Sequence, residues 1–164
     1  MTATPRILTI NDQPITIRRC IADEVLPLRW RILRFGLAFD EARFDGDALP
    51  TSHHFAAFEP SPAGPAPVCC ATFMRSDWQV DNTREPAWQL RGMATDARYQ
   101  GQGVGTAVLQ LAEQTVLAAG EVRLLWCNAR VPALKFYERQ GWTVMSDQFD
   151  SPTAGPHRKM IKRG

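Results

Sequence analysis

Apolar and polar residues alternate in several short stretches of this chain, which predicts a series of strands. The first is expected at residues 15–20, where Ile15 and Ile17 precede Arg18 and Arg19. Residues 122–127 are apolar on both faces, a pattern typical of a buried central strand. The other strands are expected at residues 53–58, 68–75, 88–95, 142–149 and 158–161. The pattern therefore predicts a mixed sheet of six or seven strands.

Apolar residues at helical spacing predict helices between these strands. One is expected at residues 23–35, ending at Gly36, and another begins near Val104 and stops at Ala119-Gly120. A short helix is expected at residues 132–140.

The remaining segments are polar or rich in proline. Residues 39–52 are too polar for a core element and are expected to form a loop or a short helix. Residues 1–14 are expected to be a loosely held lead-in. We find no repeat and no linker, so residues 1–164 are expected to form a single α/β domain.

The stretch from Leu90 to Leu111 joins a predicted strand to a predicted helix through a loop with three glycines, Gly101, Gly103 and Gly105. Glycines let backbone N–H groups converge on a bound group, and the start of a helix adds the positive end of its dipole. This combination suits a pyrophosphate. A P-loop is excluded, because no lysine follows Gly105. A dinucleotide fingerprint is disfavoured, because the spacing is G-x-G-x-G and the next strand ends without an acidic residue.

Two motifs in order indicate a family. Gln100, Gly103 and Gly105 match Q-x-x-G-x-G, and the segment from Ala133 to Trp142 matches A-x-x-[LF]-Y-x-x-x-G-[FW]. Together they resemble the acyl-CoA-binding motifs of the GNAT superfamily, the Gcn5-related N-acetyltransferases. The stretches LRWRILRFG, FDGD and HHFAAFE also resemble a widespread subgroup of small bacterial GNAT proteins. The resemblance implies a sheet splayed between the fourth and fifth predicted strands, about four flanking helices, and acetyl-CoA as cofactor.

The resemblance also implies which residues hold the cofactor. It places the backbone of Met93, Ala94 and Thr95 along the pantetheine arm, and Gly92 is consistent with a strand bulge there. Asparagine is common in the family three residues before Ala133, where this chain has Arg130; Asn128 lies nearby, so both are candidates for contacting pantetheine. Many members have arginine or lysine at Gln100 and Gln102, so the loop depends more on backbone dipoles. The expected diphosphate site comprises Arg98, Gln100, Gly101, Gln102, Gly103, Val104, Gly105 and Thr106.

Catalysis of acetyl transfer requires a general acid for the leaving thiolate and a route for the amine proton. The resemblance places the phenol of Tyr137 near the cofactor sulfur, and its pKa near 10 suits a thiolate. Candidate bases are Asp47, His54, Glu85 and His157, of which we favour His157, although a water chain could replace them all. Acceptor recognition is expected to involve Arg34, Asp47, His54 and Arg91. For each of these residues an ordinary solvated or hydrogen-bonded role is the alternative.

Composition narrows the class of protein. The net charge is +2 and the basic residues are scattered, which gives little support for nucleic-acid binding. The four cysteines have no C-x-x-C spacing, so no metal site is expected and buried free thiols are predicted. No apolar run suggests a secretion signal or membrane span, so a cytoplasmic location is expected.

These observations favour an N-acetyltransferase that acetylates a small-molecule amine or peptide. Homodimers are common among similar proteins. The alternative is a catalytically silent CoA-binding module that serves as a sensor or partner domain, and the presence of Tyr137 favours catalysis.

Overall fold

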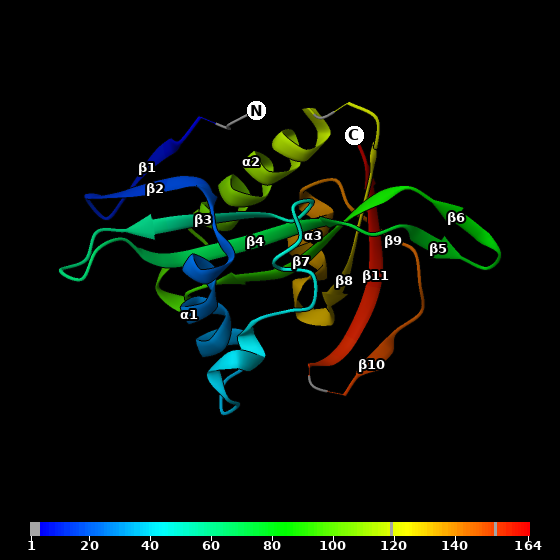
Figure 1. Cartoon of the computed structure of the whole chain (residues 1–164), viewed down its shortest axis with the longest axis horizontal. Coiled ribbons are helices and arrows are strands. Elements are labelled where there is room, and N and C mark those ends of the chain that lie inside the picture. Colours follow the sequence, from blue (N-terminus) through cyan, green and yellow to red (C-terminus); the bar gives the residue numbers. More distant parts are fainter. Residues whose placement is uncertain (1–3, 119, 153) are drawn as a thin grey trace.

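A nine-stranded mixed sheet forms the centre of the protein, which we describe from a computed structural model for residues 4–118, 120–152 and 154–164. Its strand order is β1-β2-β3-β4-β7-β8-β11-β10, β9 pairs with β11, and β5 and β6 form a separate hairpin (Figure 1). The strands are β1 (Arg6–Ile10), β2 (Gln13–Cys20), β3 (His53–Glu59), β4 (Ala66–Arg75), β5 (Trp78–Val80), β6 (Thr83–Glu85), β7 (Ala87–Thr95), β8 (Leu124–Arg130), β9 (Thr143–Val144), β10 (Phe149–Ser151) and β11 (Gly155–Arg163).

The predicted helices are confirmed, but fewer than four flank the sheet. Within the described residues there are three α-helices: α1 (Ala22–Leu33), α2 (Val104–Ala118) and α3 (Leu134–Arg139). Short 3-10 helices occur at η1 (Phe39–Ala42), η2 (Ala97–Tyr99) and η3 (Val131–Ala133). Residues 39–52 contribute only η1, because this segment lacks an apolar helical face. The predicted stop of the second helix includes residue 119, which lies outside the described residues; Gly120 follows with φ of +97°.

The sheet is larger than the predicted six or seven strands for two reasons. Residues 142–149, predicted as one strand, divide into β9 and β10. The predicted lead-in instead contains β1, which pairs antiparallel with β2. Asn11 and Asp12 have φ of 49° and 62° and form the turn between them, while Leu8 and Ile10 pack against the core. Residues 1–3 of the predicted lead-in lie outside the described part of the chain.

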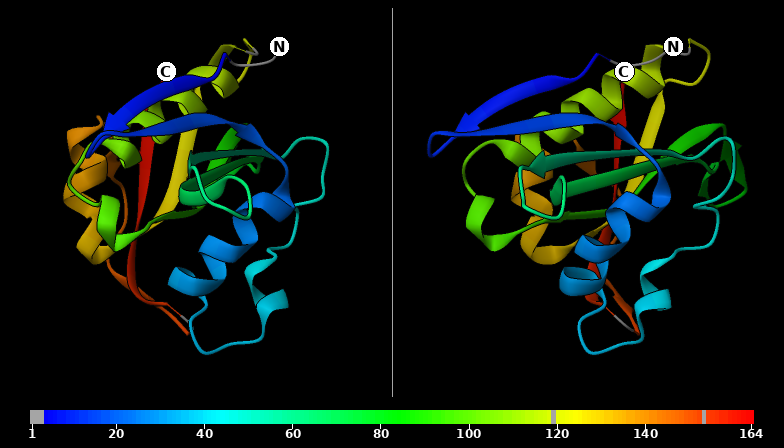
Figure 2. Two further views of the ribbon diagram at one scale, coloured as in Figure 1. Left: turned by 90° about the vertical axis from the view of Figure 1, so that its left-hand side faces the viewer. Right: turned by 60° about the vertical axis from the view of Figure 1, so that its left-hand side comes forward.

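The helices cover the two faces of the sheet, as Figure 2 shows. On one face α2 presents Val104, Val108 and Leu109 to the main core, and on the other α1 packs Val25 and Leu28 against the sheet. Adjacent cysteines in β4 face opposite sides, since Cys69 lies in the α2 core and Cys70 in the α1 core. Cys69, Cys70 and Cys127 are buried free thiols, as predicted, whereas Cys20 is half-buried.

A gap between β7 and β8 positions the candidate site. These parallel strands pair only from Ala87 with Leu124 to Leu90 with Cys127, although β7 continues to Thr95 and β8 to Arg130. On their outer sides β7 stays paired with β4, and β8 stays paired with β11 up to Arg130. The predicted splay between the fourth and fifth predicted strands is thus confirmed.

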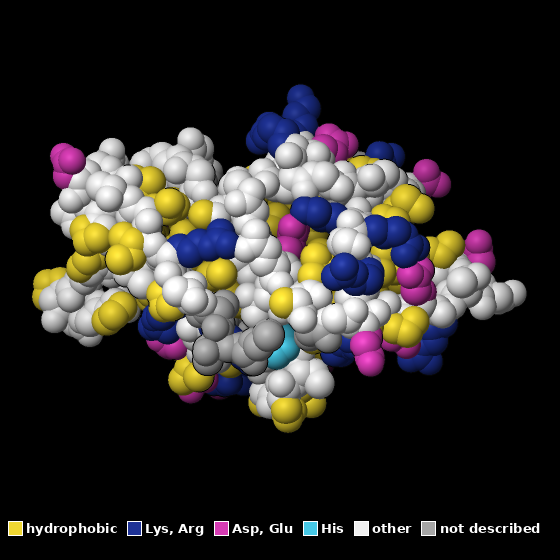
Figure 3. Space-filling view, turned by 90° about the horizontal axis from the view of Figure 1, so that it is seen from above, with side chains coloured by type: hydrophobic (Ala, Val, Ile, Leu, Met, Phe, Trp, Pro, Cys, Tyr) yellow, Lys and Arg dark blue, Asp and Glu magenta, His cyan; other side chains and the backbone are white. Residues whose placement is uncertain are grey.

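Charged side chains of both signs are dispersed over the outer surface. On the face seen in Figure 3, Lys and Arg side chains are interspersed with Asp and Glu. Among the described residues, none of the helices combines the length and the apolar character needed to cross a membrane.

Candidate active site

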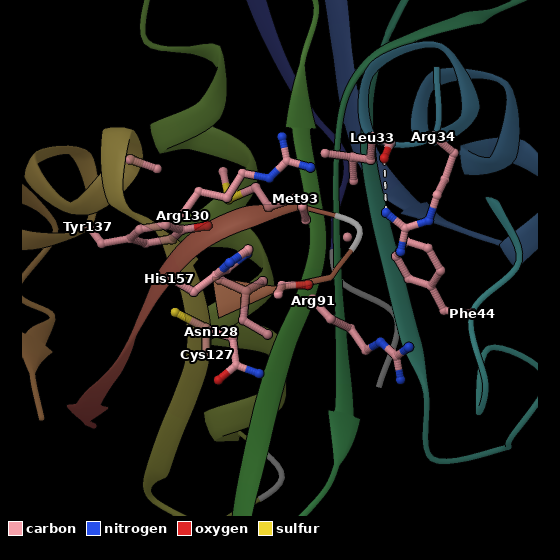
Figure 4. Close-up of a pocket in the computed structure, with 15 residues that line it drawn as sticks. Leu33, Arg34, Phe44, Arg91, Met93, Cys127, Asn128, Arg130, Tyr137 and His157 are labelled. Atoms are coloured by element: carbon pink, nitrogen blue, oxygen red, sulfur yellow. Dashed lines mark hydrogen bonds between the residues drawn. The ribbon is translucent and has the colours of Figure 1, made fainter. Parts of the chain in front are cut away.

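A cavity of about 230 Å³ lies where β7 and β8 separate (Figure 4). The two strands supply its floor, while the C-terminal end of α1, Phe44 and the segment joining β10 to β11 supply its walls. The lining residues are Leu33, Arg34, Phe44, Leu90, Arg91, Gly92, Met93, Cys127, Asn128, Arg130, Ala133, Tyr137, Ser151, Ala154 and His157. Predicted residues of the cofactor, catalytic and acceptor groups therefore meet at one place.

Tyr137 is positioned by the short helix α3, which follows Pro132 in η3. Its ring packs edge-on against Phe136 and Trp142, at centroid distances of 5.1 and 5.7 Å. Figure 4 shows the phenol directed into the cavity, and its hydroxyl has no hydrogen-bond partner among the described residues. Burial raises the pKa of Tyr137 well above its ordinary value, with smaller contributions from Cys127 and Cys69. The phenol therefore keeps its proton at neutral pH and is able to donate it.

The glycine loop presents free backbone donors at the start of α2. Gly101 and Gly103 have φ of +74° and +82°, a region that favours glycine. In the described chain, the N–H groups from Gly101 to Thr106 have no hydrogen-bond acceptor. The side-chain amides of Gln100 and Gln102 instead donate to the carbonyls of Thr95 and Arg98, at 3.1 and 2.6 Å. These unpartnered amides at a helix N-terminus fit the diphosphate of CoA.

Gly105 lies against the end of β7 and against α3. A Cβ there would lie 3.4 Å from Thr95 Oγ1 and 3.6 Å from Phe136, which are ordinary contact distances, whereas a Cβ at Gly101 or Gly103 would meet open space. The first two glycines are favoured by backbone conformation, while neither conformation nor space requires glycine at the third position.

Arg98, predicted at the diphosphate site, is engaged in ion pairs. Its guanidinium lies 2.8 Å from Glu59 and 3.0 Å from Asp96, and Tyr99 also donates to Glu59 at 2.5 Å. The Asp96 carboxylate accepts the backbone N–H of Arg98 as well, at 2.9 Å. This network fixes the turn before the glycine loop, and a phosphate would have to share Arg98 with these carboxylates.

Gly103→Ala is expected to weaken CoA binding about tenfold or more, because the loss of one well-placed amide to a charged group has that effect. An L-residue in the left-handed region costs about 1–2 kcal/mol, which the loop relieves by turning its amides away. Isothermal titration with CoA measures the change. Gly64→Ala is the matched control, since Gly64 has φ of +103° and open space around it but lies in the β3–β4 turn. Equal weakening by both variants would show that backbone strain alone, at any site, is responsible.

A β-bulge at Gly92 lies beside the cavity. Cys70 pairs with Ala94 and Thr72 with Arg91, so Gly92 and Met93 together oppose Ala71. Gly92 has φ of +61°, and a Cβ there would lie 2.6 Å from Arg29 Nε. The predicted bulge is confirmed, and its physical reason is the close approach of a buried arginine. A bulge leaves a backbone N–H unpaired, which is the donor that a thioester carbonyl needs.

Asp47 and His54 lie behind this bulge, outside the cavity lining. Both are buried: Arg29 Nη1 donates to Asp47 at 2.6 Å, and Arg29 Nη2 donates to Thr72 at 2.6 Å. His54 contacts Thr72 Oγ1 at 2.8 Å and the Asp47 carbonyl at 2.9 Å. Burial lowers the pKa of His54 and keeps it neutral. The geometry gives the two residues a supporting position and does not favour their predicted roles as base and acceptor-binding residues.

His157 is the candidate base that the fold brings to the cavity. It lies on β11 opposite Arg130, stacks on Phe149 at 5.9 Å, and contacts the Gly155 carbonyl through Nδ1 at 2.8 Å. Because a carbonyl oxygen only accepts, Nδ1 carries a hydrogen, and in the neutral imidazole Nε2 is then the nitrogen with a lone pair. The remaining candidate, Glu85, is half-buried in the β5–β6 hairpin and pairs with Arg163 at 2.7 Å, outside the cavity lining.

Phe44 is a lining residue that our sequence analysis missed. The guanidinium carbons of Arg29, Arg34 and Arg91 lie 4.5, 4.6 and 5.2 Å from its ring centroid. A single aromatic residue within the polar run from Asp40 to Asp47 is the signal that could have identified it. Asn128 and Arg130 both line the cavity from β8, and their contact with pantetheine stays a prediction.

The sequence is similar to that of a curated relative, and the fold is similar to those of solved structures. A curated relative, the uncharacterised N-acetyltransferase YitI of Bacillus subtilis (strain 168), is 28% identical over 148 residues, or 90% of this chain and 95% of YitI. The structure of Arabidopsis thaliana NAA60 in complex with acetyl-CoA has a TM-score of 0.71 at 9% identity and covers 91% of this chain and 98% of NAA60. Escherichia coli ElaA has a TM-score of 0.70 at 14% identity, covering 91% of this chain and 99% of ElaA.

The match to the acetyltransferase (GNAT) family extends over residues 23–142. This range includes the bulge, the glycine loop and Tyr137, whereas His157 lies beyond it. The family inferred from two motifs is thereby confirmed, and this chain belongs to the acetyltransferase (GNAT) family.

Proposed function

We propose that this protein transfers the acetyl group of acetyl-CoA to a primary amine of a small molecule or peptide, by direct attack of the amine on the thioester. The observation that carries the proposal is the alignment of three features along the β7–β8 gap. The backbone amides of the glycine loop, which have no partner among the described residues, lie at one end, and the bulge at Gly92 lies on β7. The buried phenol of Tyr137, whose hydroxyl likewise has no partner in the described chain, lies across the cavity.

Each residue has a definable part in this reaction. Acetyl-CoA supplies an acetyl group activated as a thioester. The amides from Gly101 to Thr106 hold the diphosphate, and the bulge at Gly92 directs an N–H at the carbonyl oxygen. As the N–C bond forms, Nε2 of His157 accepts the amine proton, directly or through water. As the C–S bond breaks, Tyr137 donates its proton to sulfur.

The principal alternative is a CoA-binding module without catalysis. Such a module needs the glycine loop but has no need of an acid at the sulfur. Tyr137 has a buried ring and a hydroxyl without a partner among the described residues, which favours an enzyme. A tyrosine with a purely structural role usually donates its hydroxyl to a protein acceptor, as Tyr99 does to Glu59.

The proposal is tested first by binding and then by transfer. CoA at about a hundred times its Kd is expected to raise the free energy of unfolding by about 2.7 kcal/mol, with no effect from NAD or ATP. Acetyl-CoA and a panel of primary amines are then incubated with the protein, and acetylated products are identified by mass. Binding without any product would favour the silent module, and stabilisation by NAD instead of CoA would contradict both hypotheses.

A further inference from the structure

Three arginines line the cavity without a carboxylate partner. Arg34, Arg91 and Arg130 all border it, and none forms an ion pair with any described residue. None of the described lining residues is acidic. By contrast, the half-buried Arg18 pairs with Glu24 and the fully buried Arg29 pairs with Asp47. The cavity lining therefore carries positive side chains with no acidic side chain among its described residues.

The protein holds Arg34 and Arg91 in place on the α1 side of the cavity. Both guanidiniums lie near the Phe44 ring. Arg34 Nη1 donates a hydrogen bond to the Leu33 carbonyl at 2.9 Å, and Arg91 Nη1 donates one to the Asp45 carbonyl at 2.7 Å. Arg91 Nη1 also contacts the Met74 sulfur. The remaining side-chain nitrogens of the two arginines have no acceptor among the described residues. Stacked and tethered arginines lose little further entropy when they bind an anion.

Positive charges that lie close together disfavour one another in this cavity. Burial lowers the pKa of Arg34, and the charge of Arg130 lowers it further. Burial also lowers the pKa of Arg91, where Arg29 and Arg34 oppose the charged form while Asp47 and Asp45 favour it. Glu41 favours the charged form of Arg34 from outside the lining. A bound anion would relieve this repulsion, whereas an amine with no negative group would add to it.

The phosphates of CoA do not account for these arginines. Arg91 directly follows the last residue of β7 that pairs with β8, whereas the glycine loop lies beyond Thr95, the last residue of the strand. Arg34 and Phe44 come from α1 and the segment after it, across β7 from α2 and its loop (Figures 2 and 4). The positive wall therefore faces the acceptor side of the site.

We propose that the acceptor is a small amine that carries a carboxylate or phosphate group, bound by Arg34 and Arg91 while Arg130 completes the positive wall. The inference rests on the proposed acetyl transfer and names its substrate class. A cavity of about 230 Å³ admits a small molecule. His157 on the opposite wall lies in reach of the same space and would receive the amine end, so the two ends of the acceptor meet complementary groups.

Matched amines test the proposal on the CoA-saturated protein. Each amino acid of a panel is compared with its carboxamide, and phosphoethanolamine with ethanolamine, so that the two pairs separate carboxylate from phosphate recognition. We expect the anionic member of at least one pair to raise the melting temperature and, with acetyl-CoA, to be acetylated with a higher kcat/KM. Equal or better use of the neutral members would overturn the inference while leaving acetyl transfer intact.

Single substitutions of Arg34 and Arg91 test whether these two residues bind the anionic group of the acceptor. Arg34→Gln and Arg91→Gln are each expected to raise KM for the anionic acceptor about tenfold or more and to leave KM for acetyl-CoA unchanged. Arg84→Gln is the control for loss of one positive charge, because Arg84 is exposed and pairs with Asp77 on the β5–β6 hairpin. A rise in KM for acetyl-CoA in place of the acceptor would overturn the assignment.

The same experiments give a different result if the proposed acetyl transfer is wrong but the anion site is right. If CoA itself does not stabilise the protein, acetyl transfer is refuted before any acceptor is tested. If CoA binds but no amine is acetylated, stabilisation of the CoA complex by an anionic member alone, lost in Arg34→Gln and Arg91→Gln, still supports the anion site. Absence of that stabilisation overturns it.

Discussion

Tyr137→Phe is expected to lower kcat for acetyl transfer about 10²- to 10⁴-fold, the usual contribution of a general acid. Affinity for acetyl-CoA is expected to change by less than about twofold, because the ring and its packing remain. Direct titration with CoA and initial rates at saturating acceptor measure the two effects separately.

The size of this effect follows from the surroundings of the phenol. The part of the core next to Tyr137 strongly disfavours a negative charge. Burial there raises the pKa of the Cys69 thiol to about 12. Burial raises the pKa of Cys127, which lines the cavity, even further. A thiolate expelled beside Tyr137 is poorly solvated for the same reason and is a strong base. The proton of Tyr137 is therefore needed at the moment when the C–S bond breaks.

Tyr99→Phe is a matched control, because the chain contains only these two tyrosines. Tyr99 is also buried, but its hydroxyl donates to Glu59 and it does not line the cavity. Its loss is expected to cost about 1.5–3 kcal/mol of stability, the usual range for a hydrogen bond to a charged group, with kcat nearly unchanged. An unchanged kcat with a raised KM for acetyl-CoA in Tyr137→Phe would instead make Tyr137 a positioning residue for pantetheine.

Local features of the site were predictable because short sequence motifs encode them. The glycine loop needs glycines at closely spaced positions, and Gly101 and Gly103, on either side of Gln102, do adopt positive φ. Tyr137 was found in the same way, since the order of the residues on one short helix determines where its phenol points. Even the bulge at Gly92 followed from a single glycine in a strand.

Features that depend on distant partners were not predictable. Arg29, Arg31 and Arg34 look equivalent in the predicted helix, yet Arg29 is fully buried, Arg31 pairs with Asp96, and Arg34, at the C-cap of α1, lines the cavity. Their positions depend on residues ten or more places away in sequence, such as Asp47 and Phe44. The predicted lead-in failed for a related reason: β1 is stable only because β2 and the core behind it provide partners.

Arg29→Met is expected to lower the free energy of unfolding by about 3–5 kcal/mol, the usual effect of removing one partner from a buried ion pair. Arg29 is fully buried and Asp47 nearly so, and Asp47 Oδ1 already has no hydrogen-bond partner among the described residues. The substitution keeps an apolar stem of similar length but leaves the Asp47 carboxylate with only the Phe44 N–H, at 2.9 Å. Urea titration followed by circular dichroism measures the loss.

Two further variants distinguish the loss of the buried Arg29–Asp47 ion pair from the loss of any arginine. Arg43→Met removes a partner of Asp23 on the surface, where both side chains are about half exposed or more, and is expected to cost less than about 1 kcal/mol.

In the double variant Arg29→Met with Asp47→Asn, no buried charge remains, so its destabilisation is expected to be smaller than the sum of the single effects by about 0.5–3 kcal/mol. Strict additivity would mean that Arg29 stabilises the fold through packing against Phe44 and Gly92 and not through Asp47. In that event Asp47→Asn alone would be tolerated, and the bulge beside the cavity would depend on the shape of the Arg29 side chain.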